Sequence, residues 1–186
     1  MNEILSDAKR ILYTAIQASL PDEAVKKFID GKTFAFEGRV IVIAIGKAAW
    51  NMAKAAAENI PHRIDTGIVL TKYDHAKGEI PGFTILEAGH PLPDENTILG
   101  TQKIMDAVSG LTEKDTVFFL VSGGGSALFE CPAGKLTLAD FLDITDQLLK
   151  CGADIVEINT IRKHLSAVKG GKFAKLCAPA QVYCIA

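Results

Sequence analysis

Apolar and polar residues alternate in blocks along this chain of 186 residues, and the blocks predict strands that alternate with helices. Short apolar runs rich in branched side chains are typical of strands covered on both faces. Longer segments with apolar residues three or four apart are typical of amphipathic helices. Such an alternation predicts βαβ crossovers and an α/β fold with a mostly parallel sheet. We expect strands at 40–45, 66–71, 83–87, 116–121 and 180–186, and helices from Pro21 and at 47–59, 94–108, 138–150, 155–168 and 172–177.

The two ends of the chain carry further expectations. Apolar residues from Ile4 to Ile16 follow a helical period and predict an amphipathic helix that packs on the core. Charged residues interrupt this segment, so it does not resemble a signal peptide. Ala180–Ala186 has the pattern of a central strand, which normally leads into another element. We interpret residues 1–186 as one domain and expect it to be the front part of a longer protein.

Composition excludes several classes of protein. Hydrophobic residues make up 48% of the chain and charged residues 23%, with a net charge of −2, which fits one α/β domain with a substantial core. The basic residues are scattered, so we expect no nucleic-acid partner. No apolar run approaches the ~18 residues of a membrane span, so we expect no membrane partner. The cysteines show no C-x-x-C pairing, which argues against a zinc site or redox motif and fits a cytoplasmic location.

Two loops that leave a strand and enter a helix are candidates for chemistry, because parallel sheets bind ligands at the carboxyl ends of their strands. The first loop contains Gly46 and Lys47. A lysine at a helix N-terminus is unfavourable by about 0.3–1 kcal/mol, and an anion bound there would reverse that sign. The alternative is a lysine that bends into solvent. The pattern from Gly46 to Asn51 departs from the dinucleotide fingerprint G-x-G-x-x-G, so it supports a nicotinamide site only weakly.

The second loop has the sequence SGGGS and follows a predicted buried strand. Exposed backbone N–H groups at such a junction form an anion cradle, and the serine hydroxyls add donors. The loop lacks the lysine of a Walker A motif and the second glycine of a nucleophile elbow. The alternative is a flexible turn. We predict phosphate binding by Ser122, Gly123, Gly124, Gly125 and Ser126.

Two further segments supply polar side chains. One predicted helix ends in a basic stretch, and Arg and Lys suit carboxylates and phosphates, although such a stretch alone is more often a solvated face. A loop stiffened by two prolines holds a histidine and an aspartate close together, and its histidine is either functional or an ordinary loop residue. The predicted substrate-binding residues are His90, Asp94, Asn159, Arg162, Lys163 and Lys169. No set of protein side chains is predicted to bind a metal.

Five motifs, in this order, resemble the glycerate 2-kinase family, the class II group associated with the MOFRL domain. They are IGKAAWNMA, LTKYDHA, EAGHPLPDENT, VSGGGSALFECP and INTIRKHLSAVKGGKFA. The resemblance runs from about residue 5 to the end. It implies a Rossmann-like three-layer α/β/α domain, the N-terminal part of a two-domain enzyme. The family's further segment, rich in Asp and Gly, and its smaller C-terminal domain are not in this sequence. Asp74 stands where many relatives have glycine.

The resemblance also implies phosphorylation of D-glycerate at its 2-hydroxyl by ATP with Mg²⁺, and it makes Lys47 the residue most closely tied to catalysis. We expect the loop amides to hold phosphate, Lys47 to stabilise the transferring group, and Arg162 or Lys163 to bind the glycerate carboxylate. His90 or Asp94 is a candidate base. A homodimer is left open. The alternatives are a nicotinamide-dependent hydroxypyruvate reductase, with Asp65 or Asp74 on the ribose, and a non-catalytic module that binds nucleotide or nothing.

Overall fold

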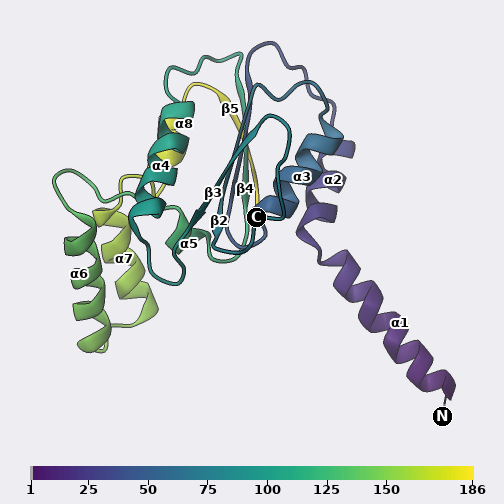
Figure 1. The fold of residues 1–186 in the computed structure, drawn as a ribbon, viewed down its shortest axis with the longest axis horizontal. Coiled ribbons are helices and arrows are strands. Elements are labelled where there is room, and N and C mark those ends of the chain that lie inside the picture. Colours follow the sequence, from purple (N-terminus) through teal and green to yellow (C-terminus); the bar gives the residue numbers. More distant parts are fainter. Residues whose placement is uncertain (1) are drawn as a thin grey trace.

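The computed structural model describes residues 2–186, which form a five-stranded sheet flanked by helices (Figure 1). The strands are β1 (Val40–Ile45), β2 (Thr66–Lys72), β3 (Phe83–Ala88), β4 (Thr116–Val121) and β5 (Gln181–Ile185). The helices are α1 (Asn2–Ala18), α2 (Pro21–Asp30), α3 (Ala49–Asn59), α4 (Glu95–Ala107), α5 (Gly125–Leu128), α6 (Leu138–Lys150), α7 (Ile155–Leu165) and α8 (Lys172–Cys177).

The sheet is parallel throughout and has the strand order β3-β2-β1-β4-β5. The first three strands are added in one direction from the central β1, and β4 and β5 are added on its other side. The order therefore reverses between β1 and β4. In open parallel sheets, ligands bind at such a switch point, outside the carboxyl ends of the strands. The predicted α/β fold with a parallel sheet is confirmed, and the two candidate loops follow these two strands.

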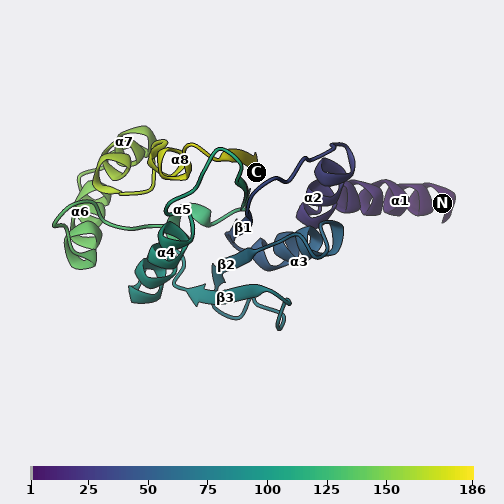
Figure 2. The same cartoon turned by 90° about the horizontal axis from the view of Figure 1, so that it is seen from above.

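Helices cover both faces of the sheet and give three layers (Figure 2). Alternate residues of β1 point to opposite faces, as the strand period of two requires. Val40, Val42 and Ala44 pack with α2 and α3 in one core, while Ile41, Ile43 and Ile45 belong to the other. Because both faces are covered, all six residues of β1 are buried.

Side-chain caps fix where several helices begin. At α4, the Asp94 side chain accepts a hydrogen bond from the Thr97 amide, and the Asp94 amide donates one to Thr97 Oγ1. Thr137 and Asp154 form the same reciprocal arrangement at α6 and α7. Such caps satisfy backbone donors that the helix leaves free. The first predicted helix after β1 begins two residues late, at Ala49, because Lys47 and Ala48 form a turn.

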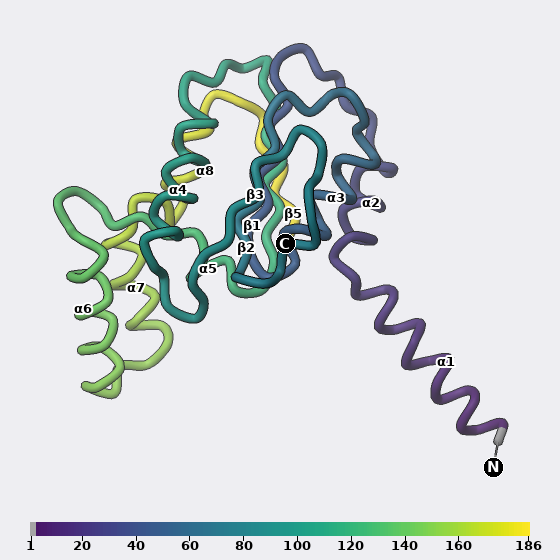
Figure 3. The backbone as a smooth tube through the Cα atoms, in the orientation of Figure 1, coloured from purple at the N-terminus to yellow at the C-terminus, as the bar shows by residue number. Residues whose placement is uncertain are grey.

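The prediction that the N-terminal helix packs on the core is wrong for the described residues. α1 leaves the domain at the start of α2 and extends away from it (Figure 3). Its apolar stripe is open, with Ile4 77% and Ile11 67% exposed. Helical periodicity identifies an apolar face, but not the surface that the face covers.

Helices α6 and α7 form a second projection, at the opposite end of the long axis from α1 (Figures 1 and 2). They pack on each other and join the domain through two extended segments. Pro132 and Ser166 pair in an antiparallel bridge between these segments. We call α6, α7 and the loop between them the arm, and residues 130–133 with 165–169 the base of the arm. The arm carries Asn159, Arg162 and Lys163.

Candidate functional site

The two candidate loops bind each other at the switch point of the sheet. The amide of Lys47 donates to the Gly123 carbonyl at 2.9 Å, and the amide of Ala48 donates to Ser122 Oγ at 3.0 Å. Gly46 has a φ of 108°, and a Cβ there would lie 2.3 Å from Ser122 Oγ. Gly46 is therefore required both for its backbone conformation and for the close approach of the second loop.

The three consecutive glycines have three different environments. Gly124 has a φ of 89°, and a Cβ on it would lie 2.9 Å from His90 Nε2. Gly125 begins α5, where a Cβ would press on the Ile45 side chain at 3.3 Å. Gly123 is exposed, and a Cβ there would meet nothing within 4 Å. Two of the glycines are thus explained by the protein itself, whereas the space at Gly123 is open to a ligand.

The loop also has free hydrogen-bond donors. Within residues 2–186, the amides of Gly123, Gly124 and Ser126 donate to no protein acceptor. The amide of Gly125, which we also predicted to hold phosphate, instead donates to the Ser122 carbonyl at 3.2 Å. Successive free amides in a turn that passes through a left-handed residue form an anion-binding concavity.

Cationic side chains gather on one side of this loop. Lys47 is exposed, and its ammonium forms no ion pair among the described residues. His75 Nδ1 lies 3.0 Å from the Lys47 carbonyl oxygen. Burial lowers the pKa of His90, and the charges of Lys47, Lys72 and His75 lower it further. His90 is therefore neutral near pH 7.

Lys72 and His75 were missed as site residues in the sequence. Lys72 ends β2 and His75 follows three residues later, so both lie at the carboxyl edge beside β1. Their segment was noticed only as part of the motif LTKYDHA. Its position at the end of a strand next to β1 was the signal that pointed to the site.

Asp94 is held by groups of the protein. Its carboxylate accepts hydrogen bonds from the Thr97 amide at 2.9 Å and from the Tyr73 hydroxyl at 2.7 Å. Burial alone would raise the pKa of Asp94, but these hydrogen bonds outweigh it and lower the pKa. The structure thus gives Asp94 a role in capping α4, and a direct contact with substrate stays a prediction.

A cavity of about 370 Å³ lies beside the glycine loop. Its floor is apolar and includes Phe119, Phe129 and Phe173, whose ring centroids lie 4.8–5.7 Å apart. The polar part of its lining consists of residues predicted from the sequence: Gly125, Ser126, Asn159, Arg162, Lys163 and Lys169. The fold therefore brings the glycine loop and the basic stretch of α7 into one cavity, which Lys47 and His90 do not line.

The two best-placed cations of this cavity differ in their partners. The Nε of Arg162 is buried and has no hydrogen-bond partner among the described residues, and its guanidinium carbon lies 5.5 Å from the centroid of the Phe141 ring. Lys169, by contrast, donates to the buried Glu130 carboxylate and, at 2.9 Å, to the Phe129 carbonyl. Burial lowers the pKa of Lys169, and the Glu130 charge opposes that effect. The Lys169 ammonium is engaged by the protein.

The protein side chains do not by themselves fit a magnesium site. Within residues 2–186, no three His, Cys, Asp or Glu side chains are grouped to hold a metal ion. Two carboxylates near Lys47, Lys72 and His75 already accept hydrogen bonds from the protein. Asp94 accepts them from the Thr97 amide and the Tyr73 hydroxyl, and Glu87 accepts them from the amides of His75 and Ala76. Mg²⁺ commonly binds through substrate phosphates together with one or two carboxylates. We therefore assign no further role to Mg²⁺ from these residues.

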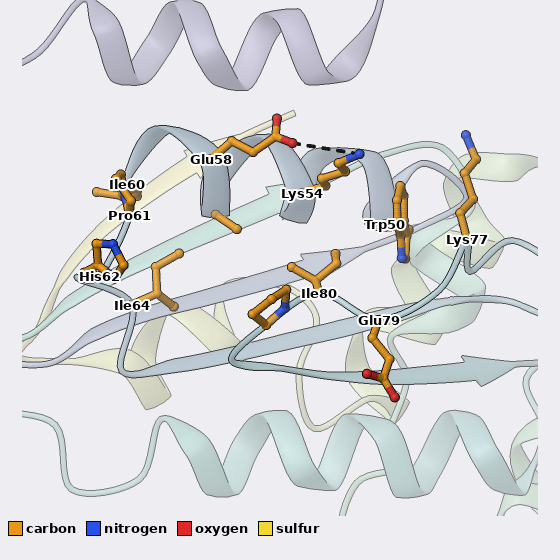
Figure 4. A pocket seen from close by; sticks show the side chains of 12 residues that line it. Trp50, Lys54, Glu58, Ile60, Pro61, His62, Ile64, Lys77, Glu79 and Ile80 are labelled. Carbon is orange, nitrogen blue, oxygen red and sulfur yellow. Dashed lines mark ion pairs between the residues drawn. The ribbon is translucent and has the colours of Figure 1, made fainter.

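Another cavity, of about 600 Å³, lies beside α3 (Figure 4). Trp50, Ile60 and Ile80 line it, and an ion pair of 3.8 Å joins Lys54 to Glu58 beside it. The indole of Trp50 donates to the Gly78 carbonyl at 2.8 Å. None of the site residues predicted from the sequence lines this cavity, so it is separate from the switch-point site.

The fold, with its glycine loop at the switch point of the sheet, defines a Rossmann-like three-layer α/β protein. The chain belongs to the family described as "Domain of unknown function (DUF4147)", whose model matches residues 7–186. In the described residues, no helix is both long and apolar enough to cross a membrane.

Relatives with names are similar over most of this chain. It is 51% identical over 175 residues to "D-glycerate 2-kinase" of Thermotoga maritima, covering 94% of this chain and 41% of the relative. It is 46% identical over 176 residues to "Glycerate 2-kinase" of Pyrococcus horikoshii, covering 90% and 39%. A crystal structure of glycerate kinase from Thermotoga maritima matches 99% of this chain and 44% of that chain, with a TM-score of 0.92 and 49% identity. The chain thus spans less than half the length of these relatives.

Proposed function

We propose that the protein containing this chain phosphorylates D-glycerate at its 2-hydroxyl with ATP, giving 2-phosphoglycerate. The observation that carries this proposal is the group of free amides at Gly123, Gly124 and Ser126, next to an unpaired lysine at the switch point of the sheet. The names of the relatives supply the reaction. The homodimer stays open, and the cytoplasmic location stays a prediction.

Each group has a role that its position supports. Phosphoryl transfer depends on positioning and on neutralising the charge that spreads over the phosphoryl oxygens. The free amides of the loop would hold phosphate oxygens, with the hydroxyl of Ser126 as a further donor. Lys47 lies on the neighbouring loop, whose backbone is hydrogen-bonded to the glycine loop, and its ammonium would neutralise charge on the transferring group. The Lys72 ammonium adds positive potential from the end of the next strand.

The cavity beyond the loop supplies groups for a carboxylate. Arg162 lines this cavity, and guanidinium groups bind carboxylates through directed, charge-assisted hydrogen bonds. Asn159 and Lys163 line the same cavity. His90 is neutral near pH 7 and is therefore the better candidate to accept the hydroxyl proton, since the Asp94 carboxylate is engaged in its cap.

The reductase alternative has little support in the geometry. The Asp65 carboxylate accepts a hydrogen bond from the Val40 amide at 2.7 Å. Val40 begins β1, so Asp65 lies at the amino edge of the sheet, away from a ribose at the carboxyl edge. Asp74 follows the carboxyl end of β2, but the glycine pattern that should accompany it is degraded.

A product assay tests the proposed function. We would join residues 1–186 to the part of the Thermotoga maritima relative that lies beyond the aligned region, and assay this chimera and the isolated chain with D-glycerate and Mg–ATP. Enolase converts 2-phosphoglycerate and not 3-phosphoglycerate, so coupling to enolase reports the position of the phosphate. We expect enolase-dependent product from the chimera. A folded chimera that oxidises NADH with hydroxypyruvate and forms no 2-phosphoglycerate would contradict the proposal.

A further inference from the structure

The base of the arm contains a buried ion pair. The Glu130 side chain is 0% exposed, and one of its carboxylate oxygens accepts a hydrogen bond from the Lys169 ammonium. The other oxygen accepts the Cys131 amide at 3.0 Å. Lys169 also donates a hydrogen bond to the carbonyl of Phe129, the residue that follows α5 in the sequence. The pair thus fixes the end of the loop segment to the chain that leaves α7.

The base is where the orientation of the arm is set. The Ala133 amide donates to the Leu165 carbonyl at 2.7 Å, and the Ala167 amide donates to the Cys131 carbonyl at 2.7 Å. These bonds join the two segments to each other. Beyond them, α6 and α7 pack on each other and project from the domain (Figure 3). A small rotation at the base would therefore move every residue of the arm relative to the sheet.

The glycine loop forms one wall of the cavity beside it, and the arm forms another. Gly125 and Ser126 come from the loop, whereas Asn159, Arg162 and Lys163 come from the arm. A ligand that binds both walls requires a fixed distance between them. The Glu130–Lys169 pair lies at the junction of these walls, because Lys169 itself lines the cavity.

The energetics of a buried ion pair point to a role other than stabilising the fold. Removing two charges from water costs several kcal/mol per ion, and apolar residues of similar volume often stabilise a fold equally well. A charge-assisted hydrogen bond requires a short distance and a defined direction between its donor and acceptor, so the pair restricts how the two segments can lie. We propose that Glu130 and Lys169 are positioning residues that hold the arm, and with it Arg162, in register with the glycine loop. The proposal rests on the proposed function, in which the two walls of the cavity contact two ligands that react with each other.

The two exposed cysteines provide a direct test of the arm's position. Cys151 lies just after α6, in the arm, and Cys184 lies on β5, in the sheet. In a background with Cys131→Ser and Cys177→Ala, nitroxide labels at Cys151 and Cys184 report the arm-to-sheet distance by pulsed electron resonance. We expect one narrow distance distribution for the chain with Glu130 and Lys169 intact. The double variant Glu130→Leu with Lys169→Met should keep a cooperative urea transition but give a broadened or displaced distribution.

Another buried carboxylate serves as a matched control. Asp115 pairs with Arg39 at 3.4 Å, before β4 at the amino edge of the sheet and away from the arm. Asp115→Asn should lower the urea midpoint and leave the Cys151–Cys184 distribution unchanged. Where the double variant does not fold, Glu130→Gln takes its place, with the same displaced distribution expected. An unchanged distribution in a folded Glu130 variant would overturn the positioning role.

A ligand measurement separates this proposal from the proposed function. Calorimetric titration of the unmodified chain with Mg–ATP and with D-glycerate tests binding itself, and failure of both would count against the proposed function alone. Where the unmodified chain binds, the double variant should bind about tenfold more weakly, a change of ~1.4 kcal/mol. Equal affinity together with an unchanged distance distribution would overturn the positioning role and leave the proposed function standing.

Discussion

At the scale of single residues, the glycine loop shows how much of a site depends on the absence of side chains. Gly124 needs its left-handed backbone conformation and lies against His90, while Gly123 has neither constraint. The sequence predicted that something approaches this loop closely. It did not indicate that His90 and Ile45 account for two of the three glycines, because that requires knowing which segments the fold places beside the loop.

Substitution of Gly124 should be costly where substitution of Gly123 is not. A left-handed conformation costs a residue with a Cβ about 1–2 kcal/mol, and the contact with His90 adds to that. We therefore expect Gly124→Ala to lower the free energy of urea unfolding by at least ~1 kcal/mol. Gly123→Ala should change it by less than ~0.5 kcal/mol, as is usual at open surface positions. Equal losses in the two variants would show that the loop conformation differs from the one described.

Lys47 is the residue that should matter most for catalysis. Removing one electrostatic contact to a developing charge typically costs ~2.7–4 kcal/mol, a 10²–10³-fold loss of kcat. We expect this loss for Lys47→Ala in the chimera, with little change in the urea midpoint because the side chain is exposed and forms no ion pair. Lys54→Ala, in the adjacent helix, is the matched control and should retain activity. A loss of less than about tenfold, or ~1.4 kcal/mol, would remove Lys47 from the catalytic group.

Asp115 gives the fold a defined response to acid. Hydrogen bonds, first from the Thr112 amide and then from Arg39, outweigh burial and lower its pKa from 3.8 to about 2. Because the folded pKa lies below the unfolded one, the carboxylate stabilises the fold above about pH 4, and this contribution is lost as pH falls toward 2. Urea midpoints of the unmodified chain and Asp115→Asn should therefore differ at pH 7 and converge between pH 4 and pH 2. A constant difference across that range would contradict this role.

At the scale of elements, sequence patterns predicted most of the strands and helices, with ends that lie within three residues of those in the structure. Continuous apolar runs identified β1 and β4 with their observed bounds, because a strand covered on both faces leaves little ambiguity. The predicted last strand forms as β5, although within residues 2–186 it lies at the edge of the sheet and is only partly covered. Its pattern did not reveal its position in the strand order, which depends on pairing between distant segments.

The sequence pattern predicted least well the positions of the helices that project from the domain. Periodicity gave α1, α6 and α7 their helical character, but not their projection from the domain. Lys169 illustrates the same limit for a site residue. It was predicted to bind substrate from its place in a basic stretch, whereas its partner Glu130 lies 39 residues earlier in the chain.

Removal of α1 should leave the domain intact. The helix is exposed along its described length and contributes no residue to either core cluster. We expect a chain that begins at Leu20 to have the same urea midpoint as the unmodified chain. The paired deletion of α2, whose Val25 and Ile29 are buried, should abolish the cooperative transition. A lower midpoint on removal of α1 alone would mean that its apolar stripe covers part of this chain in solution.

At the scale of the whole molecule, the strand order and the loops together explain the site. The strand order reverses between β1 and β4, and both candidate loops follow these strands at the carboxyl edge, where open parallel sheets bind ligands. The arm brings further cations, Arg162 and Lys163, to the cavity beside the glycine loop. Motif order along the sequence could not show that Arg162 lines this cavity whereas Lys47 does not.

The most direct test of this account is an amide chemical-shift map of the ¹⁵N-labelled chain during titration with Mg–ATP. We predict the largest shifts at Gly123, Gly124, Ser126 and Lys47, saturating together, and their loss in Lys47→Ala. Shifts confined to the Trp50 cavity, or none at the glycine loop when the chain is folded, would contradict the central claim that these free amides bind the phosphates.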